Sequence, residues 1–169
     1  MLDLVKRVLG LTLKGGDVRL DVPRVAQEKP NSCWHAAATM IWLFWQGRTG
    51  RQGPMNTAQG AYARADSTGL FPQEFVTLAG KVGMQALPVR NTHSEADLAD
   101  LLRNHGPLWC AGYWYGVGHV IVLTGVSPGK VYLNDPDGAR AREGTIAWFN
   151  EKLATSVPGC LMYKDPTRY

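Results

Sequence analysis

The chain has 169 residues and a formal net charge of +4, with proportions of apolar and charged residues that are ordinary for a globular protein. This length suits one domain with its own hydrophobic core. The lysines and arginines are dispersed, so there is no basic cluster of the kind that binds nucleic acid. No apolar run is long enough to span a bilayer, and residues 1–16 lack the cleavage site of a usual secretory signal. We therefore expect a soluble protein with no nucleic-acid partner and no membrane insertion.

The number of cysteines is odd, and Cys33, Cys110 and Cys160 lie far apart in the sequence. No two of them have the close spacing of a zinc site, and at least one thiol must stay unpaired within the chain. We therefore expect a reducing environment or a thiol with a chemical role, no metal site and no cofactor.

The first part of the chain shows mainly helical patterns. After a short amphipathic stretch over 2–9 and the pair Gly15-Gly16, residues 18–25 alternate between apolar and polar, which indicates an extended segment. The spacing of apolar residues predicts helices over 32–45, 56–65, 72–82 and 95–104, the last with a capping box formed by Ser94 and Asp97. Residues 46–48 predict the start of a polar loop.

The second part is rich in strand patterns. Residues 108–115 and 119–126 are apolar runs, 131–133 is a short strand after the turn at Pro128-Gly129, and 160–163 is a last strand after a helix over 146–153. Helices followed by strands indicate an α+β fold. We expect a single domain with a lead-in segment at 1–17, a mainly helical half at 18–106 and an antiparallel β-sheet half at 107–169.

Cys33 opens the most apolar of the predicted helices. A turn over 28–31 precedes it, and both Asn31 and Ser32 are good helix N-caps, so Cys33 is expected in the first helical turn. There the free backbone N–H groups and the helix dipole favour a thiolate, which is the nucleophilic form. Residues 36–45 are apolar almost all round, which indicates a helix buried in the middle of the domain. Cys33 is therefore a candidate nucleophile, and a structural buried thiol is the alternative.

His119 is the candidate base for this nucleophile. It opens the apolar strand over 119–126, directly after Gly116-Val117-Gly118. Asp135 follows the next strand, and the tight turn between the two strands makes them antiparallel neighbours. The start of one strand then lies beside the end of the other, which brings Asp135 near His119. A carboxylate there can orient the imidazole, with the adjacent Asn134 as the rival.

Gln27 is the candidate oxyanion residue. Its side-chain amide and the backbone N–H of Cys33 can both donate to a developing oxyanion. The candidate substrate-binding residues are Trp34, Trp114 and Gly118, and core packing is the alternative for the two tryptophans.

The order of these residues resembles the papain-like cysteine peptidases. The matching positions are, in order, Gln27, Cys33-Trp34, Gly118-His119 and Asp135-Pro136. The Asp-Pro ending and the small size are similar to the bacterial branches, which are the double-glycine leader peptidases of ABC transporters and the type III effector proteases of plant pathogens. The resemblance covers roughly 18–163 and implies a papain-like fold with a cleft between a helical and a β-sheet subdomain.

The resemblance also implies a role for each matching residue. Gln27 would be the oxyanion residue, Cys33 the nucleophile, His119 the general base and acid, and Asp135 the residue that orients the imidazole. Papain itself has an asparagine in the last place, which keeps Asn134 as the alternative to Asp135.

We interpret the chain as a cysteine endopeptidase that acts through an acyl-enzyme on Cys33, with a protein or peptide substrate. Only a short segment precedes Gln27, so no long inhibitory propeptide is expected. The hypothesis follows that a specialised bacterial secretion system exports the chain as a toxin or effector into a target-cell cytoplasm, with an immunity protein as its inhibitor. A transglutaminase or glutamine deamidase, and a non-catalytic peptide-binding module, are the alternative functions. Gly15-Gly16 predicts a helix stop and turn, with a self-processing site as the alternative.

Overall fold

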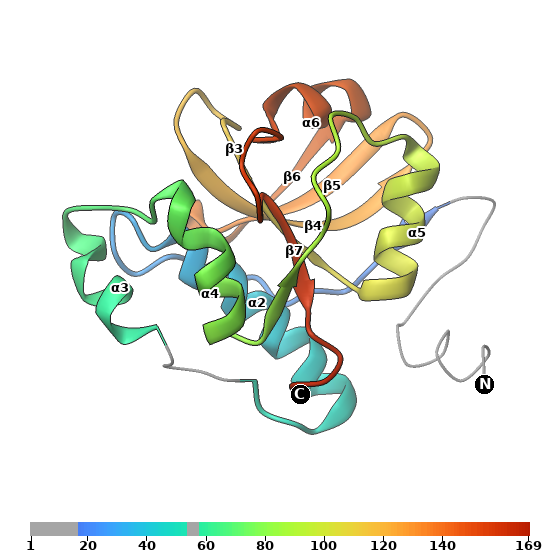
Figure 1. Cartoon of the computed structure of the whole chain (residues 1–169). Helices are drawn as coiled ribbons and strands as arrows, with labels where there is room; N and C mark the ends of the chain where they lie inside the picture. The colour runs from blue at the N-terminus through green and yellow to red at the C-terminus, as the bar shows by residue number, and fades with distance from the viewer. Residues whose placement is uncertain (1–16, 54–57) are drawn as a thin grey trace.

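The computed structural model describes residues 17–53 and 58–169, so the predicted helix over 2–9 and the pair Gly15-Gly16 lie outside the described residues. Within these ranges the helices lie mainly in the first part of the chain, and most strands follow in the second part (Figure 1). The strands pair into one antiparallel sheet. The predicted α+β fold is confirmed.

Helix α2 (Cys33–Thr49) is the central helix, and it packs against β3 (Leu108–Gly112) and β4 (His119–Ser127). Its buried side chains point in several directions, as expected for a helix surrounded by core: Trp34, Ala36, Ala37, Ala38, Met40, Ile41, Trp42 and Phe44. The helix ends at Gly50, whose φ of 70° is the left-handed conformation that glycine adopts without strain. It therefore runs beyond the predicted end at residue 45, and the loop predicted over 46–48 is wrong.

The remaining helices lie where the apolar spacing predicted them, with shifted ends. Ser94 and Asp97 form the predicted capping box, because each side chain accepts a hydrogen bond from the backbone N–H of the other. The apolar face of the helix after Pro72 is buried, and it consists of Phe75, Leu78, Ala79 and Val82. The elements are α3 (Gln59–Ala63) with a 3₁₀ turn (Arg64–Asp66), a 3₁₀ turn (Pro72–Glu74) with α4 (Phe75–Lys81), α5 (Glu95–His105) and α6 (Ile146–Lys152).

The sheet places β4 at its centre. Its strand order is β2 (Met84–Ala86), β7 (Leu161–Lys164), β3, β4, β5 (Lys130–Asp135) and β6 (Arg140–Thr145), and β1 (Val18–Arg19) pairs with the end of β4. In β4 every residue from Val120 to Val126 is buried, while His119 at its start is only partly buried. The start of β4 therefore carries a firmly held side chain whose ring still reaches the surface.

Two strands have no counterpart in the sequence prediction. Strand β2 is short, and β6 reads Arg-Ala-Arg-Glu-Gly-Thr, which contains almost no apolar side chain. Strand β6 lies at the edge of the sheet, and its residues alternate between exposed and half-buried. An edge strand with two solvated faces needs no apolar alternation, so the pattern that identifies other strands is missing here.

Across the described ranges, no helix combines the length and apolar character that crossing a bilayer requires.

Candidate active site

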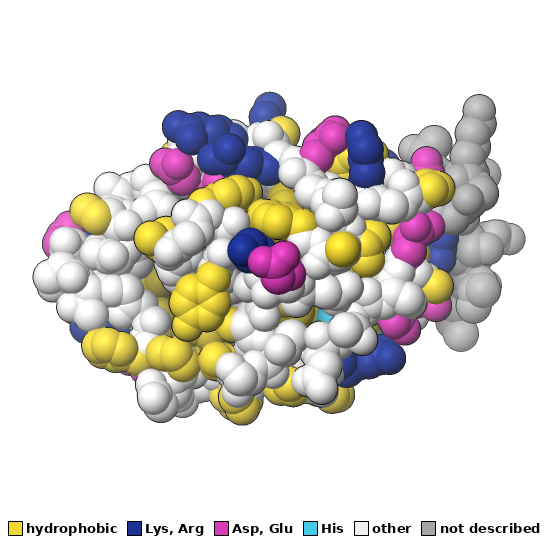
Figure 2. All heavy atoms as spheres, turned by 90° about the horizontal axis from the view of Figure 1, so that it is seen from above, with side chains coloured by type: hydrophobic (Ala, Val, Ile, Leu, Met, Phe, Trp, Pro, Cys, Tyr) yellow, Lys and Arg dark blue, Asp and Glu magenta, His cyan; other side chains and the backbone are white. Residues whose placement is uncertain are grey.

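A cleft of about 700 Å³ lies between the helical part and the sheet, and both parts contribute to its lining. Leu70 and Phe75 form an apolar wall on the helical side, and Tyr113 and Val117 lie on the sheet side. Hydrophobic side chains gather around the middle of the face seen from above (Figure 2). The walls of the cleft are therefore largely apolar.

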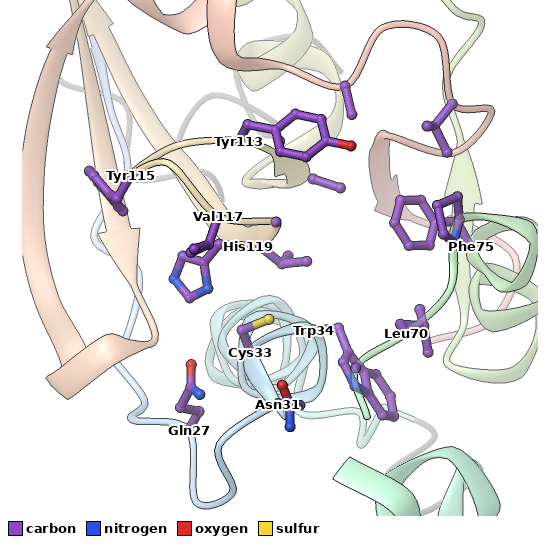
Figure 3. Close-up of a pocket in the computed structure, with 18 of the residues that line it drawn as sticks. Gln27, Asn31, Cys33, Trp34, Leu70, Phe75, Tyr113, Tyr115, Val117 and His119 are labelled. Carbon is purple, nitrogen blue, oxygen red and sulfur yellow. The ribbon is translucent and has the colours of Figure 1, made fainter. Parts of the chain in front are cut away.

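Cys33 lines this cleft as the first residue of α2. The side chain of the N-cap residue Ser32 does not cap the helix, because its hydroxyl bonds the backbone N–H and carbonyl of Lys29 instead. The first N–H groups of the helix therefore have no intrahelical partner at the position of the thiol, which favours negative charge there. Figure 3 shows the Cys33 sulfur at the end of the helix, on the side of His119.

His119 and Asp135 form a direct pair. The His119 Nε2 atom lies 2.7 Å from Asp135 Oδ1, and the Cys33 thiol lies near enough to the imidazole to raise its pKa. Since Nε2 is used by the carboxylate, Nδ1 is the atom that can exchange a proton with Cys33. The side chain of Asp135 is fully buried, whereas that of His119 is 12% exposed. The structure thus brings a thiol, an imidazole and a carboxylate into one row at the cleft.

Asn134 points away from this row. Its Nδ2 donates to the backbone carbonyl of Val22 at 2.9 Å, and the side chain is buried. Successive side chains of a strand point to opposite faces, so only one of Asn134 and Asp135 can meet His119. The carboxylate takes that place, and the catalytic role of Asp135 stays a prediction.

The environment favours the charged forms of both partners. Burial alone lowers the pKa of His119, but its hydrogen bonds to Asp135 and Cys33 outweigh burial and raise this pKa to about 9. Burial alone raises the pKa of Asp135, yet hydrogen bonds from His119, the Asp137 N–H and Arg142 lower it below its usual range. At neutral pH these shifts favour a carboxylate next to an imidazolium, which is the partner that a thiolate needs.

Gln27 lies at the cleft, but its amide N–H groups face the wrong way for an oxyanion donor. Its Nε2 donates to the carbonyls of Lys29 at 3.0 Å and Pro30 at 2.8 Å, which uses both N–H bonds. Its Oε1 is buried without a partner among the described residues and points towards His119 in Figure 3. To donate to an oxyanion, the side chain must first release one of these carbonyls.

The three predicted substrate-binding residues separate into two groups. Trp34 and Gly118 line the cleft, although the Trp34 side chain is almost fully buried, and their role in substrate binding stays a prediction. The prediction for Trp114 is wrong, because its side chain is buried, donates to the carbonyl of Cys110 and packs against other aromatic rings. Its neighbours Tyr113 and Tyr115, in the loop between β3 and β4, line the cleft instead.

Several residues at or near the cleft were not predicted. Asn31 lies in the loop before Cys33, and Leu70 follows Gly69 in a loop of the helical part. Arg142, from the edge strand β6, donates to the second oxygen of Asp135. An apolar residue in a glycine-containing loop was the available signal for Leu70, but Arg142 lies in a strand that the sequence pattern did not reveal.

In the part of the chain that the structure describes, no group of three or more His, Cys, Asp or Glu side chains is arranged to hold a metal ion.

Comparison with known proteins identifies the family of this chain. A family model described as "Papain-like cysteine protease AvrRpt2" matches residues 17–154. The chain belongs to this family. As a papain-like cysteine protease it is an enzyme, and the resemblance seen in the sequence is confirmed.

A solved structure shows the same papain-like fold. It is the crystal structure of a double-glycine motif protease from an AMS/PCAT transporter in complex with the leader peptide. The TM-score is 0.57 at 16% sequence identity, and the alignment covers 86% of this chain and 91% of that one. A search of curated protein sequences found no match.

We expect Cys33 of this papain-like protease to react with iodoacetamide far faster than Cys110 or Cys160 at neutral pH. Burial raises the pKa of both other thiols and removes them from solvent, whereas Cys33 lines the cleft beside His119. Mass spectrometry of peptides from the labelled native protein gives the three rates. The protein unfolded in urea is the control, in which all three thiols should react. Equal rates in the native protein would contradict the assignment of Cys33.

Variants of Asp135 and Asn134 should have opposite effects. Asp135→Ala should lose most activity, by up to about 10⁴-fold in kcat if Asp135 orients the imidazole as a triad carboxylate does. Asp135→Asn should keep part of it, because an amide can still hold the ring. Asn134→Ala should have a mild effect on kcat/KM and should lower the free energy of unfolding by about 1 kcal/mol, since the bond to Val22 is lost. A crippled Asn134→Ala with a nearly normal Asp135→Ala would reverse the assignment.

Proposed function

We propose that the protein is an endopeptidase that cleaves an extended peptide segment bound in the cleft, through an acyl-enzyme on Cys33. The observation that carries the proposal is the row of Cys33, His119 and Asp135 at a cleft lined by both parts of the fold. Family membership supports a cysteine protease, and the structure with the similar fold was solved with a peptide bound.

The proposed reaction begins with the proton of the Cys33 thiol passing to Nδ1 of His119. The thiolate attacks the carbonyl carbon of the substrate, and His119 then gives its proton to the leaving amine. A water molecule, with His119 as base, hydrolyses the thioester and restores the thiol. Asp135 keeps the imidazole in place and stabilises its charged form throughout.

The oxyanion of this reaction would lie at the N-terminus of α2. The backbone N–H of Cys33 has no intrahelical partner there and can donate to it. We propose Gln27 as the second donor, with its amide turning away from the carbonyls of Lys29 and Pro30 when substrate binds. Each of these neutral hydrogen bonds contributes only about 1 kcal/mol net, so exchanging one for a bond to an oxyanion is favourable.

New peptide termini in a cell lysate test the endopeptidase proposal. Wild type should generate N-termini that are missing when the lysate is incubated with Cys33→Ala, because the alanine variant lacks only the nucleophile. Circular dichroism of both proteins controls for folding. Release of ammonia from glutamine without new termini would instead identify a deamidase or transglutaminase. An intact lysate together with a Cys33 that iodoacetamide does not modify would indicate a peptide-binding module.

A Gln27→Ala variant tests the oxyanion assignment. Loss of an oxyanion donor should lower kcat by about 10²–10³-fold with little change in KM, whatever the loss of the bonds to Lys29 and Pro30 does to Tm. If the amide only ties Lys29 and Pro30 into their turn, the variant should instead show a lower Tm with nearly normal kcat. Measuring kcat, KM and Tm on the same preparation separates the two roles.

Export into a target cell and inhibition by an immunity protein stay predictions from the sequence.

A further inference from the structure

Arg142 holds the oxygen of Asp135 that His119 does not use. Its Nε donates to Asp135 Oδ2 at 2.8 Å, while Oδ1 accepts from His119 Nε2 at 2.7 Å. Arg142 lies opposite Leu133 in the pairing of β6 with β5, two residues before Asp135 on the same face. The register of the edge strand therefore delivers a guanidinium to the carboxylate from the side away from the thiol.

Both oxygens of Asp135 need partners because the side chain is fully buried. A buried carboxylate is stable only when its charge is paired and its lone pairs accept hydrogen bonds. Oδ1 accepts from His119 and from the Asp137 N–H at 2.9 Å, and Oδ2 accepts from Arg142. Without Arg142 the carboxylate would keep one well-bonded oxygen and could rotate about its last bond.

Arg142 is itself held in place by an aromatic ring. Its guanidinium lies 4.6 Å from the centre of the Tyr115 ring, a stacking distance for a cation on an aromatic face. The Tyr115 ring centre lies 6.4 Å from that of His119 and 6.1 Å from that of Trp148. The guanidinium is thus fixed by a carboxylate on one side and by an aromatic face on another.

We propose that Arg142 is a positioning residue of this protease, which fixes the rotation of the Asp135 carboxylate and, through it, the orientation of the His119 ring. The inference rests on the proposed function of Cys33, His119 and Asp135. Arg142 acts through Asp135 and does not have to touch the substrate. It should therefore affect kcat rather than KM.

The charge of Arg142 gives the proposal a second, independent signature. The charged and titratable groups around the pair come from several elements: Cys33 of α2, Tyr115 of the β3–β4 loop, His119 of β4, Asp137 of the turn after β5 and Arg142 of β6. Removing the only guanidinium bound to Asp135 in the described chain leaves the Asp135 carboxylate facing the imidazole with no cation on its other oxygen. The thiol, the carboxylate and the imidazolium would then all lose their protons at higher pH.

Arg140 offers a matched control on the same strand. It carries the same charge and faces the same side of the sheet, but its guanidinium binds Asp137 at the surface, with both side chains more than half exposed. An exposed ion pair of this kind contributes little to stability or to a buried site. Arg140→Gln therefore removes one positive charge nearby without removing a bond to Asp135.

The experiment measures two pH profiles for wild type, Arg142→Gln, Arg142→Met, Arg142→Lys and Arg140→Gln. One is the rate of alkylation of Cys33 by iodoacetamide, and the other is kcat/KM on a peptide identified from the lysate.

In Arg142→Gln and Arg142→Met the acid limb of both profiles should move up by about one pH unit. Their kcat should fall by about 10-fold or more with little change in KM, because Arg142 binds Asp135 and does not itself contact the reacting atoms. Arg142→Lys should keep the limb near the wild-type pH, and Arg140→Gln should match wild type in both profiles.

If the acid limbs of the pH profiles do not move in a folded Arg142→Gln or Arg142→Met, the proposal is overturned, even if Tm falls. A merely structural arginine would lower stability without changing the ionisation of Cys33. Two uncharged variants of similar length keep the test decisive if one of them does not fold. The alkylation profile needs no substrate. If the acid limb of the alkylation profile shifts but wild type cleaves no peptide, the endopeptidase proposal is rejected while the role of Arg142 stands.

Discussion

The contact of helix α2 with the sheet decides whether this protein has an active site. The proposed nucleophile Cys33 belongs to the first turn of α2 and the His119 imidazole to the start of β4, so the proposed chemistry requires these two element ends to meet. A buried hydrogen bond fixes the meeting point, because Nε1 of Trp109 in β3 donates to the carbonyl of Trp34, the residue after Cys33, at 3.1 Å. An indole N–H buried at this depth is costly to leave unpaired, so sliding the helix along the sheet would lose this bond together with apolar packing. The sheet and the thiol are thereby held in one register.

The second requirement is a carboxylate buried in the sheet, which the fold tolerates because its neighbours supply donors. Asp135 ends β5 directly before Pro136, where strand pairing ends and the backbone N–H of Asp137 becomes free to bond the carboxylate. His119 and Arg142 reach the same group from the strands on either side. An ion buried in this way contributes little net stability compared with apolar packing, so its presence is better explained by the chemistry of the adjacent imidazole than by the stability of the fold.

Local signals in the sequence were sufficient to find the row of reacting groups. A turn before an apolar helix located Cys33, glycines before an apolar strand located His119, and a proline after the next strand located Asp135. The features that the sequence did not reveal depend on particular side-chain and backbone contacts, some of them local. The end of α2 was missed because Gly47 and Arg48 are weak signs of a loop, and Arg48 in fact bonds the carbonyl of Phe44 and covers its ring. Strand β6, the burial of Trp114 and the amide orientation of Gln27 depend on edge pairing, on packing against the rings of Trp148 and Phe149, and on hydrogen bonds within a loop, which composition and periodicity do not encode.

The loop over 27–32 connects all of these parts. At its start, the N–H of Gln27 donates to the carbonyl of Pro136, directly after Asp135, at 2.9 Å. Near its end, the N–H of Asn31 donates to the carbonyl of Ala65 at 3.0 Å, which ties it to the segment that leads to the apolar wall of the cleft. Lys29 adds an ion pair with Asp66 at 2.8 Å, although its exposure makes this the weaker link. Since the same loop leads directly into Cys33, backbone hydrogen bonds fix the carboxylate, the cleft wall and the thiol relative to one another, so a peptide bound against the wall would also lie at the thiol.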